Sequence, residues 1–151
     1  MNRGGLPWNT NECRLLRRAW AAYSRGDVDG FAACLTDDWR EFEVGEEGYV
    51  TLDDERPTMA LHRSAFPDKH TDILQVVADD ATVACYCIVT ATHTRTYIDA
   101  EPTGKRLVVH EMMFNRVRDG RLAETWALTA GPGFYRQITG RDAPVSVDNL
   151  G

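Results

Sequence analysis

The sequence lacks the features that mark membrane, secreted and nucleic-acid-binding proteins. It contains no apolar run long enough to cross a bilayer. Its N-terminus has no apolar segment of the kind that signal peptides contain. Basic residues are not in excess, because 17 Lys and Arg stand against 23 Asp and Glu and give a net charge of −6. Nucleic-acid-binding domains usually carry a basic patch instead. We therefore expect a cytoplasmic protein that binds neither nucleic acid nor membrane.

Motifs for common cofactors and for a catalytic serine are missing as well. No Gly-rich phosphate loop precedes a predicted helix, and the sequence has no nucleophile elbow, the turn that presents a catalytic serine. The four cysteines do not stand with other Cys or His residues at zinc-ligand spacing. Cys85 and Cys87 alternate within a strand-like run, where we expect them to be small buried side chains. We predict no metal site and no cofactor.

A chain of 151 residues suits one domain with a real hydrophobic core. Apolar residues recur at helical spacing over residues 13–23, a short helix begins at Asp27, and Thr51 with Asp54 forms a capping signal for a helix over 51–66. Strands are predicted over residues 39–44, 73–77, 82–94, 106–117 and 122–129, and a short closing helix over 134–138. Helices followed by a strand meander predict an α+β fold whose helices pack on one face of the sheet.

The most informative segment is the pair of long strands joined at Asp119 and Gly120, because alternate residues of a strand face opposite sides of a sheet. The turn admits two registers. A two-residue loop pairs Arg118 with Arg121, and a three-residue loop pairs Val117 with Arg121. We prefer the three-residue loop because it gathers small residues and one carboxylate on one face, which suits a cavity wall.

The same register leaves a large apolar outer face, which suits a partner subunit. The predicted inward set is Val109, Glu111, Met113, Asn115, Ala123, Thr125, Ala127 and Thr129, and the predicted outward set is Val108, His110, Met112, Phe114, Leu122, Trp126 and Leu128.

Six short motifs occur in an order typical of one family. They are Tyr23-Ser24-Arg25-Gly26-Asp27, Asp37-Asp38-Trp39, Phe66-Pro67-Asp68, Thr92-His93-Thr94, Pro102-Thr103-Gly104-Lys105-Arg106 and the run from Arg116 to Trp126. With them the sequence resembles the SnoaL-like polyketide cyclase branch of the nuclear transport factor 2-like superfamily, which includes ketosteroid isomerase. The resemblance covers residues 11–139 and leaves 1–10 as an N-terminal extension and 140–151 as a C-terminal tail.

The resemblance implies a cone-shaped barrel, in which a curved antiparallel sheet wraps around N-terminal helices and leaves an apolar pocket. It also implies a homodimer, whose contact we expect through the outer sheet face. It does not fix the function, because this superfamily includes cyclases, isomerases, hydrolases, dehydratases and binding proteins.

The sequence departs from the family at two positions that transfer protons. The resemblance places the catalytic aspartate of the aldol cyclases at Ala127, and a pocket histidine at Met113. Neither alanine nor methionine can move a proton, so we do not expect the same aldol mechanism. The resemblance also places the catalytic base of ketosteroid isomerase at Glu43.

Other polar residues are candidates to replace the missing pair. We predict Glu43, Glu111 and His93 as catalytic, because carboxyls in an apolar cavity have raised pKa values and can divide acid and base roles. Alternatively, Glu41 and Glu43 face solvent in an acidic strand. Glu111 then pairs with an arginine such as Arg106, and His93 is a surface or hydrogen-bonding histidine. The predicted substrate-binding residues are Tyr23, Trp39, Glu41, Met59, Phe66, Met113, Ala127 and Thr129.

Three functions remain open from the sequence. The first is a cofactor-free cyclase or isomerase of secondary metabolism, which folds a hydrophobic polyketide-like intermediate and assists the reaction with carboxylates. The second is an epoxide-opening hydrolase or cyclase centred on Glu43. The third is a small-molecule-binding module without catalysis.

Overall fold

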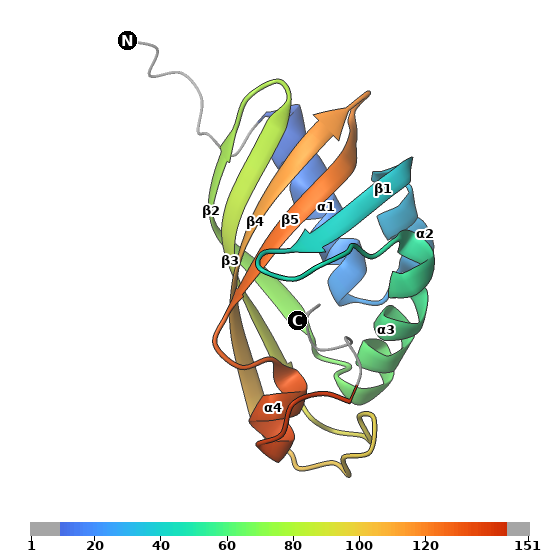
Figure 1. Ribbon diagram of the computed structural model, residues 1–151, viewed down its shortest axis with the longest axis vertical. Helices are drawn as coiled ribbons and strands as arrows, with labels where there is room; N and C mark the ends of the chain where they lie inside the picture. Colours follow the sequence, from blue (N-terminus) through green and yellow to red (C-terminus); the bar gives the residue numbers. More distant parts are fainter. Residues whose placement is uncertain (1–9, 145–151) are drawn as a thin grey trace.

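The computed structural model describes residues 10–144 (Figure 1), so most of the predicted N-terminal extension and C-terminal tail lie outside the described residues. The helices are α1 (Asn11–Ser24), α2 (Val28–Ala32), α3 (Leu52–Ala65) and α4 (Phe134–Thr139). The strands are β1 (Leu35–Glu43), β2 (His70–Ala78), β3 (Thr82–Thr92), β4 (Arg106–Arg118) and β5 (Arg121–Ala130). The α+β class is confirmed. Within residues 10–144, none of the helices has the length and apolar character that a membrane span requires.

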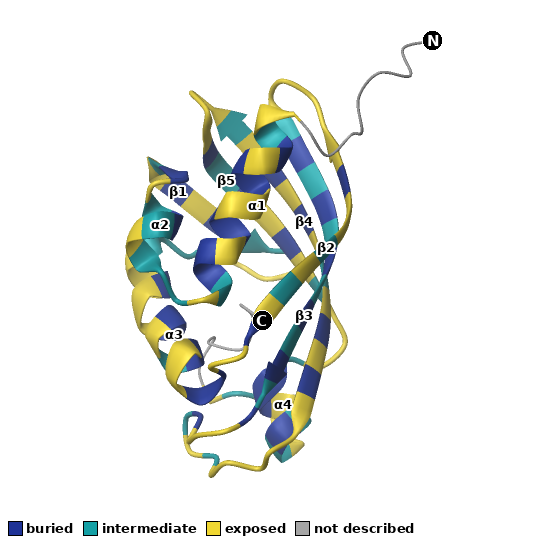
Figure 2. Ribbon diagram, turned by 180° about the vertical axis from the view of Figure 1, so that it is seen from behind, coloured by how far each residue is buried: buried dark blue, intermediate teal, exposed yellow. Residues whose placement is uncertain are grey.

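The five strands form one curved sheet in the order β1-β5-β4-β3-β2, with α1 lying across one face (Figures 1 and 2). Neighbours from β2 to β5 run antiparallel, but β1 runs parallel to β5. The sheet is therefore mixed and is not closed into a barrel, contrary to the antiparallel barrel expected from the sequence. After β1 the chain continues through α3 and reaches β5 only after three further strands. The alternation of residues within a strand does not tell whether two strands connected in this way pair parallel or antiparallel.

Side chains at the helix starts explain where α1 and α3 begin. The hydroxyl of Thr10 accepts a hydrogen bond from the backbone N–H of Cys13 at 3.2 Å. At α3, the Thr51 hydroxyl accepts from the Asp54 backbone N–H, and the Asp54 carboxylate accepts from the Thr51 backbone N–H at 2.8 Å. This reciprocal pair is a capping box, and the predicted signal is confirmed with Asp in the place of the usual Glu.

The β4–β5 hairpin differs from the predicted register at its turn. Arg118 pairs with Arg121 across a two-residue loop, and both loop residues have positive φ, 52° at Asp119 and 71° at Gly120. These angles fit the primed turn that matches the twist of a hairpin. The three-residue loop was therefore the wrong choice.

A register shift next to the turn restores the predicted faces further along the hairpin. The shift lies between Arg116 and Val117, and beyond it Met113 pairs with Ala127. From Glu124 onward, inward and outward residues agree with the prediction. Leu122 does not: it lies before the shift and is fully buried, although the sequence placed it on the outer face.

The core has two parts, and buried and exposed residues alternate along the strands that connect them (Figure 2). The first lies under α1 and α2 and centres on Phe31, whose ring contacts the Trp20, Tyr23 and Trp39 rings at 5.2–5.6 Å between centroids. The second lies beside α4 and centres on Phe66. This division matters because the polar cavity described below lies where the two parts meet.

A buried polar chain connects four strands within the first core. Thr125 accepts a hydrogen bond from the Trp39 indole N–H at 3.1 Å and donates one to the Asn115 side-chain oxygen at 2.7 Å. The Asn115 amide in turn donates to the Val83 carbonyl at 3.2 Å. Since Thr125 and Asn115 are fully buried, each of these groups depends on the others for a partner.

We predict that Thr125→Val destabilises the protein although it keeps the shape of the side chain. The change leaves the Trp39 N–H and the Asn115 oxygen buried without a partner, and each costs about 1–3 kcal/mol. The free energy of unfolding, measured by urea denaturation, should fall by about 2 kcal/mol or more. Thr90→Val, at a half-buried position of β3, is the matched control and should change it by less than about 0.5 kcal/mol. Equal losses in the two variants would contradict the role given to the chain.

Candidate functional site

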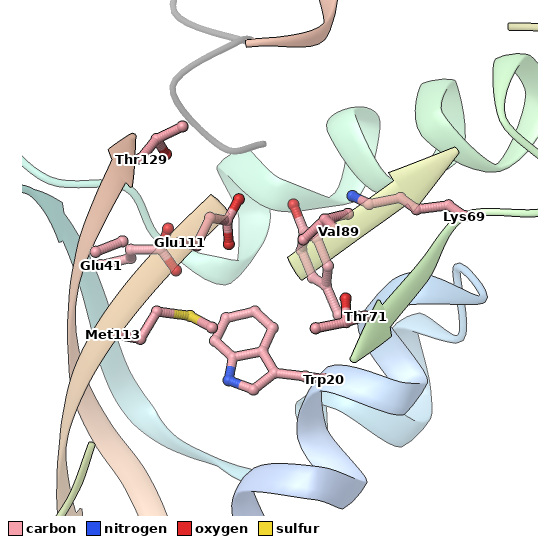
Figure 3. Close-up of a pocket in the computed structure, with 10 residues that line it drawn as sticks. Trp20, Glu41, Lys69, Thr71, Val89, Glu111, Met113 and Thr129 are labelled. Atoms are coloured by element: carbon pink, nitrogen blue, oxygen red, sulfur yellow. The ribbon is translucent and has the colours of Figure 1, made fainter. Parts of the chain in front are cut away.

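A small cavity lies between α1 and the inner face of the sheet (Figure 3). The space that the centre of a water molecule can reach is about 20 Å³, enough for about one or two waters. Its lining residues are Trp20 and Tyr23 from α1, Glu41 from β1, Lys69 from the turn before β2, Thr71 from β2, Val89 from β3, Glu111 and Met113 from β4, and Ala127 and Thr129 from β5. The apolar pocket expected from the sequence is thus, in this structure, a narrow cavity with charged side chains.

Two local features direct the charged side chains inward. Glu111 and Met113 are alternate residues of β4, and Glu41 lies on the inner side of β1, so strand alternation explains all three. Lys69 follows a turn that Asp68 holds in place. The Asp68 carboxylate accepts hydrogen bonds from the backbone N–H of Thr92 at 2.7 Å and from its hydroxyl at 2.6 Å.

Three carboxyls surround this cavity. Glu41 lines it and is 8% exposed, Glu111 lines it from β4 and is half-buried, and Glu55, 1% exposed, is hydrogen-bonded to Tyr23. Burial raises the pKa of Glu111 and the pKa of Glu55 to about 7 each. Burial, with the charges of Glu55 and Glu111, raises the pKa of Glu41 well above its ordinary value. Near neutral pH the group therefore keeps protons that exposed carboxyls would lose.

Tyr23 and Lys69 are the other polar groups of the cluster. The Tyr23 hydroxyl donates to a Glu55 oxygen at 2.8 Å, and the second Glu55 oxygen has no hydrogen-bond partner among the described residues. The Lys69 Nζ lies 4.7 Å from the centroid of the Tyr23 ring. Burial lowers the pKa of Lys69 to about 8, although the charges of Glu111, Glu55 and Glu41 act in the opposite direction.

His62 fixes the position of the Lys69 amine. The Lys69 Nζ lies 3.0 Å from His62 Nδ1, and His62 Nε2 lies 3.1 Å from the Tyr97 hydroxyl. Burial and the neighbouring Lys69 lower the pKa of His62, which keeps the imidazole neutral. A protonated Lys69 can only donate, so His62 Nδ1 accepts a hydrogen bond from it. The hydrogen of the neutral ring is therefore assigned to Nε2, which faces the Tyr97 hydroxyl.

Glu43 lies beside the cavity, at the end of β1. One carboxylate oxygen accepts a hydrogen bond from the Thr129 backbone N–H at 3.2 Å. The other is buried and has no partner among the described residues. Burial raises the pKa of Glu43, and its charge raises the pKa of both Glu41 and Glu111.

The other predicted catalytic residue, His93, lies apart from the carboxyl cluster. It is fully buried, and its Nδ1 accepts a hydrogen bond from the Thr103 backbone N–H at 3.2 Å. Its ring lies 5.8 Å from the Phe66 ring, in the second core.

The predicted substrate-binding residues divide between the cavity wall and the packed interior. Five of the eight line the cavity: Tyr23, Glu41, Met113, Ala127 and Thr129. The remaining three are packed in the cores: Trp39 and Met59 in the first and Phe66 in the second.

Sequence reasoning missed Glu55 and Lys69. Glu55, Met59 and His62 are spaced as positions i, i+4 and i+7 of α3, and all three are buried. That spacing marks a buried helix stripe, and the acidic start of the helix obscured it. Lys69 carries no periodic signal, because it lies in the turn between α3 and β2.

Comparison with known proteins agrees with this architecture. A curved five-stranded mixed sheet with helices against its inner face defines a fold of the nuclear transport factor 2-like class. The sequence model of the SnoaL-like polyketide cyclase family matches residues 14–138. This chain therefore belongs to the SnoaL-like polyketide cyclase family. A comparison with curated proteins found no match.

Solved structures with the same fold come from several bacteria. AclR, a proposed hydroxylase from Streptomyces galilaeus, is 28% identical over 78% of this chain and 86% of its own, with a TM-score of 0.69. IdmH, a proposed polyketide cyclase from Streptomyces antibioticus, is 20% identical over 80% and 92%, with a TM-score of 0.68. A proposed polyketide cyclase from Acidithiobacillus ferrooxidans is 20% identical over 91% and 100%, with a TM-score of 0.74.

The buried carboxyls predict an unusual dependence of stability on pH. Between the ordinary value of 4.5 and about 7, folded Glu55 and Glu111 hold protons that the unfolded chain releases. Their contribution to stability is therefore complete below pH 4.5 and is lost as the pH rises through about 7. The lowered pKa of Asp68 acts below 3.8, outside this window. The lowered pKa values of His62 and His93 act in the opposite direction below 6.5, because these histidines take up protons in the unfolded chain that they do not hold in the folded state.

We therefore expect the melting temperature to fall as the pH rises from about 6.5 to about 7.5, where the unfolded histidines have lost their protons and the folded carboxyls are losing theirs. Glu55→Gln should flatten this dependence, because glutamine does not titrate and still accepts the hydrogen bond from Tyr23. The measurement is thermal unfolding followed by circular dichroism. A melting temperature that rises steadily across this range in the wild type would contradict the burial argument.

Proposed function

We propose that this protein is a cofactor-free cyclase or isomerase of secondary metabolism, which moves protons on a hydrophobic, polyketide-like intermediate. Family membership gives the coarse class. The observation that supports the finer proposal is the pair Glu41 and Glu111 on one cavity wall, with Lys69 opposite (Figure 3). Two neighbouring carboxyls whose environments separate their pKa values can act as acid and base.

The two carboxyls have different roles in this mechanism. Burial and the charges of Glu55 and Glu111 raise the pKa of Glu41 well above its ordinary value, and Glu41 is the acid that donates to a carbonyl oxygen of the substrate. Glu111, with a pKa of about 7, is partly ionised and accepts the proton from the adjacent carbon. The positive charge of Lys69 stabilises the enolate that forms. The enolate then takes up a proton at another carbon, which is isomerisation, or attacks a second carbonyl, which closes a ring.

The substrate is larger than the cavity, because small-molecule sites usually occupy about 300–1,000 Å³. A surface groove of about 490 Å³ along α1 and β2 shares Trp20, Lys69 and Thr71 with the cavity wall. We infer that the body of the substrate lies in this groove and that its reacting carbonyl enters the cavity past these three residues. The groove would thereby fold the chain before proton transfer.

Glu43 and His93, which the sequence predicted as catalytic, take lesser roles in this proposal. Glu43 is the alternative base to Glu111, because it accepts a hydrogen bond from Thr129 on the cavity wall and its charge acts on both Glu41 and Glu111. His93 supports the end of β3 through Thr103. Both are included in the test below.

We predict that Glu111→Gln lowers kcat by about 10²–10⁴-fold with little change in KM, because it removes the base and keeps the shape. The measurement is exchange of the α-hydrogens of a β-keto ester for deuterium, followed by NMR. Glu41→Gln and Glu43→Gln are compared in the same assay, together with His93→Gln.

Glu101→Gln, at an exposed loop position far from the cavity, is the control and should exchange at the wild-type rate. Unchanged exchange in the double variant of Glu41 and Glu111 would eliminate the acid–base mechanism.

We propose further that two copies of the chain associate through the outer sheet face. This face exposes large apolar side chains, which are Val77, Val108, Met112, Phe114, Trp126 and Leu128, each at least 41% exposed. The Trp126 ring stacks on the Phe42 ring of the edge strand β1 at 4.4 Å between centroids, which extends the apolar surface to that edge. Apolar patches of this kind mark association sites.

We expect wild-type protein to have about twice the chain mass of 17.0 kDa in light scattering. Met112→Lys should shift it to the monomer, because it places a charge in the centre of the buried contact. Thr96→Lys, on an exposed loop, is the control and should remain a dimer. A wild-type monomer at high concentration would refute this interface.

A further inference from the structure

Lys69 has the surroundings of a reactive amine. It is 7% exposed, lines the cavity and also borders the surface groove along α1 and β2. Its hydrogen bond is to the neutral His62 ring at 3.0 Å. No carboxylate of residues 10–144 forms an ion pair with its Nζ. An amine that served only as a counter-ion would be expected to contact one of the acids directly.

We propose that Lys69 acts as a nucleophile and forms an imine with an aldehyde or ketone carbonyl of the substrate. The inference deepens the proposed function, on which it depends for the presence of a carbonyl in the substrate. It adds a covalent intermediate, which the proton-transfer mechanism does not contain. The groups that face the amine are Tyr23, Glu41, Glu55, His62 and Glu111.

These neighbours supply what imine formation requires. Burial lowers the pKa of Lys69 to about 8, so about a tenth of the amine is neutral at pH 7, against well under one part in a thousand for an ordinary lysine. The His62 Nδ1 orients the amine as a hydrogen-bond acceptor. Burial raises the pKa of both Glu41 and Glu111, that of Glu111 to about 7, so these carboxyls can protonate an oxygen in the cavity. Lysines that form Schiff bases are activated by such burial.

The step balances without an oxidant or a reductant. The neutral Nζ attacks the carbonyl carbon and forms a C–N bond, while the carbonyl π electrons move to oxygen, which takes a proton from the Glu111 or Glu41 carboxyl. The nitrogen then returns one proton to that carboxylate. The same carboxyl protonates the hydroxyl, which leaves as water while the nitrogen lone pair forms the C=N bond. The imine draws electrons from the adjacent carbon and makes its hydrogen more acidic.

The test is reductive trapping with a small ketone. The full chain is incubated at pH 7 with butanone and sodium cyanoborohydride, and the modified residue is located by proteolysis and mass spectrometry. The sequence offers a matched internal control, since its only two lysines are buried Lys69 and exposed Lys105. We expect Lys69 to gain one butyl group at least about tenfold faster than Lys105.

Two variants complete the experiment. Lys69→Arg should abolish the fast phase, and Lys105→Arg should leave it unchanged. Modification of Lys69 no faster than that of Lys105 in the wild type, including none at all, overturns the proposal. This comparison needs no variant, so a folding defect in Lys69→Arg cannot obscure it.

The trapping result is independent of the proton-transfer assay. If Glu111→Gln loses α-hydrogen exchange while wild-type Lys69 is not trapped, the proposed function stands and the imine is rejected. If Lys69 is trapped while the Glu41 and Glu111 variants exchange normally, the imine stands and the carboxyl mechanism is rejected.

Discussion

The burial of more acidic than basic groups in one small space is the constraint on which the site depends. Glu41 and Glu111 line a cavity with room for about one or two waters, and Glu55 is hydrogen-bonded to Tyr23 on its wall. The charges of all three act on a single amine, that of Lys69. Three ionised carboxylates could not remain there, because burial and mutual repulsion both disfavour charge. The cluster must therefore keep protons near neutral pH, and a cluster that keeps protons can also supply and receive them.

The fold maintains this unfavourable arrangement by rigid connections around it. The chain from Trp39 through Thr125 and Asn115 ties β1 to β5 and β4 below the cavity. On the opposite side, the Asp68 turn and His62 hold Lys69 against α1. Strain and uncompensated polarity persist only where the surrounding packing determines the structure, and here two separate aromatic cores provide that packing.

Much of this could be predicted from the sequence, and the failures have physical causes. Strand alternation correctly placed Glu111, Met113 and Ala127 on the inner wall, because a two-residue period depends only on local geometry. The register at the turn failed because a single shifted residue in β5 is not visible in the pattern. The parallel pairing of β1 could not be predicted, since it depends on a connection of many residues. Lys69 could not be predicted either, because a turn has no period.

The position of the acids along the sheet argues for chemistry that differs from that of the aldol cyclases. The resemblance seen in the sequence implies that the family's proton-transferring residues fall at Met113 and Ala127, and these two positions pair directly across β4 and β5. Glu111 pairs with Thr129, one row further along the same face. Two residues of a strand span about 7 Å, so the acid meets a substrate atom several bonds away from the one that the family's aspartate would meet. A substrate held in the same orientation would therefore lose a proton from a different carbon, and the ring or double bond formed would differ accordingly.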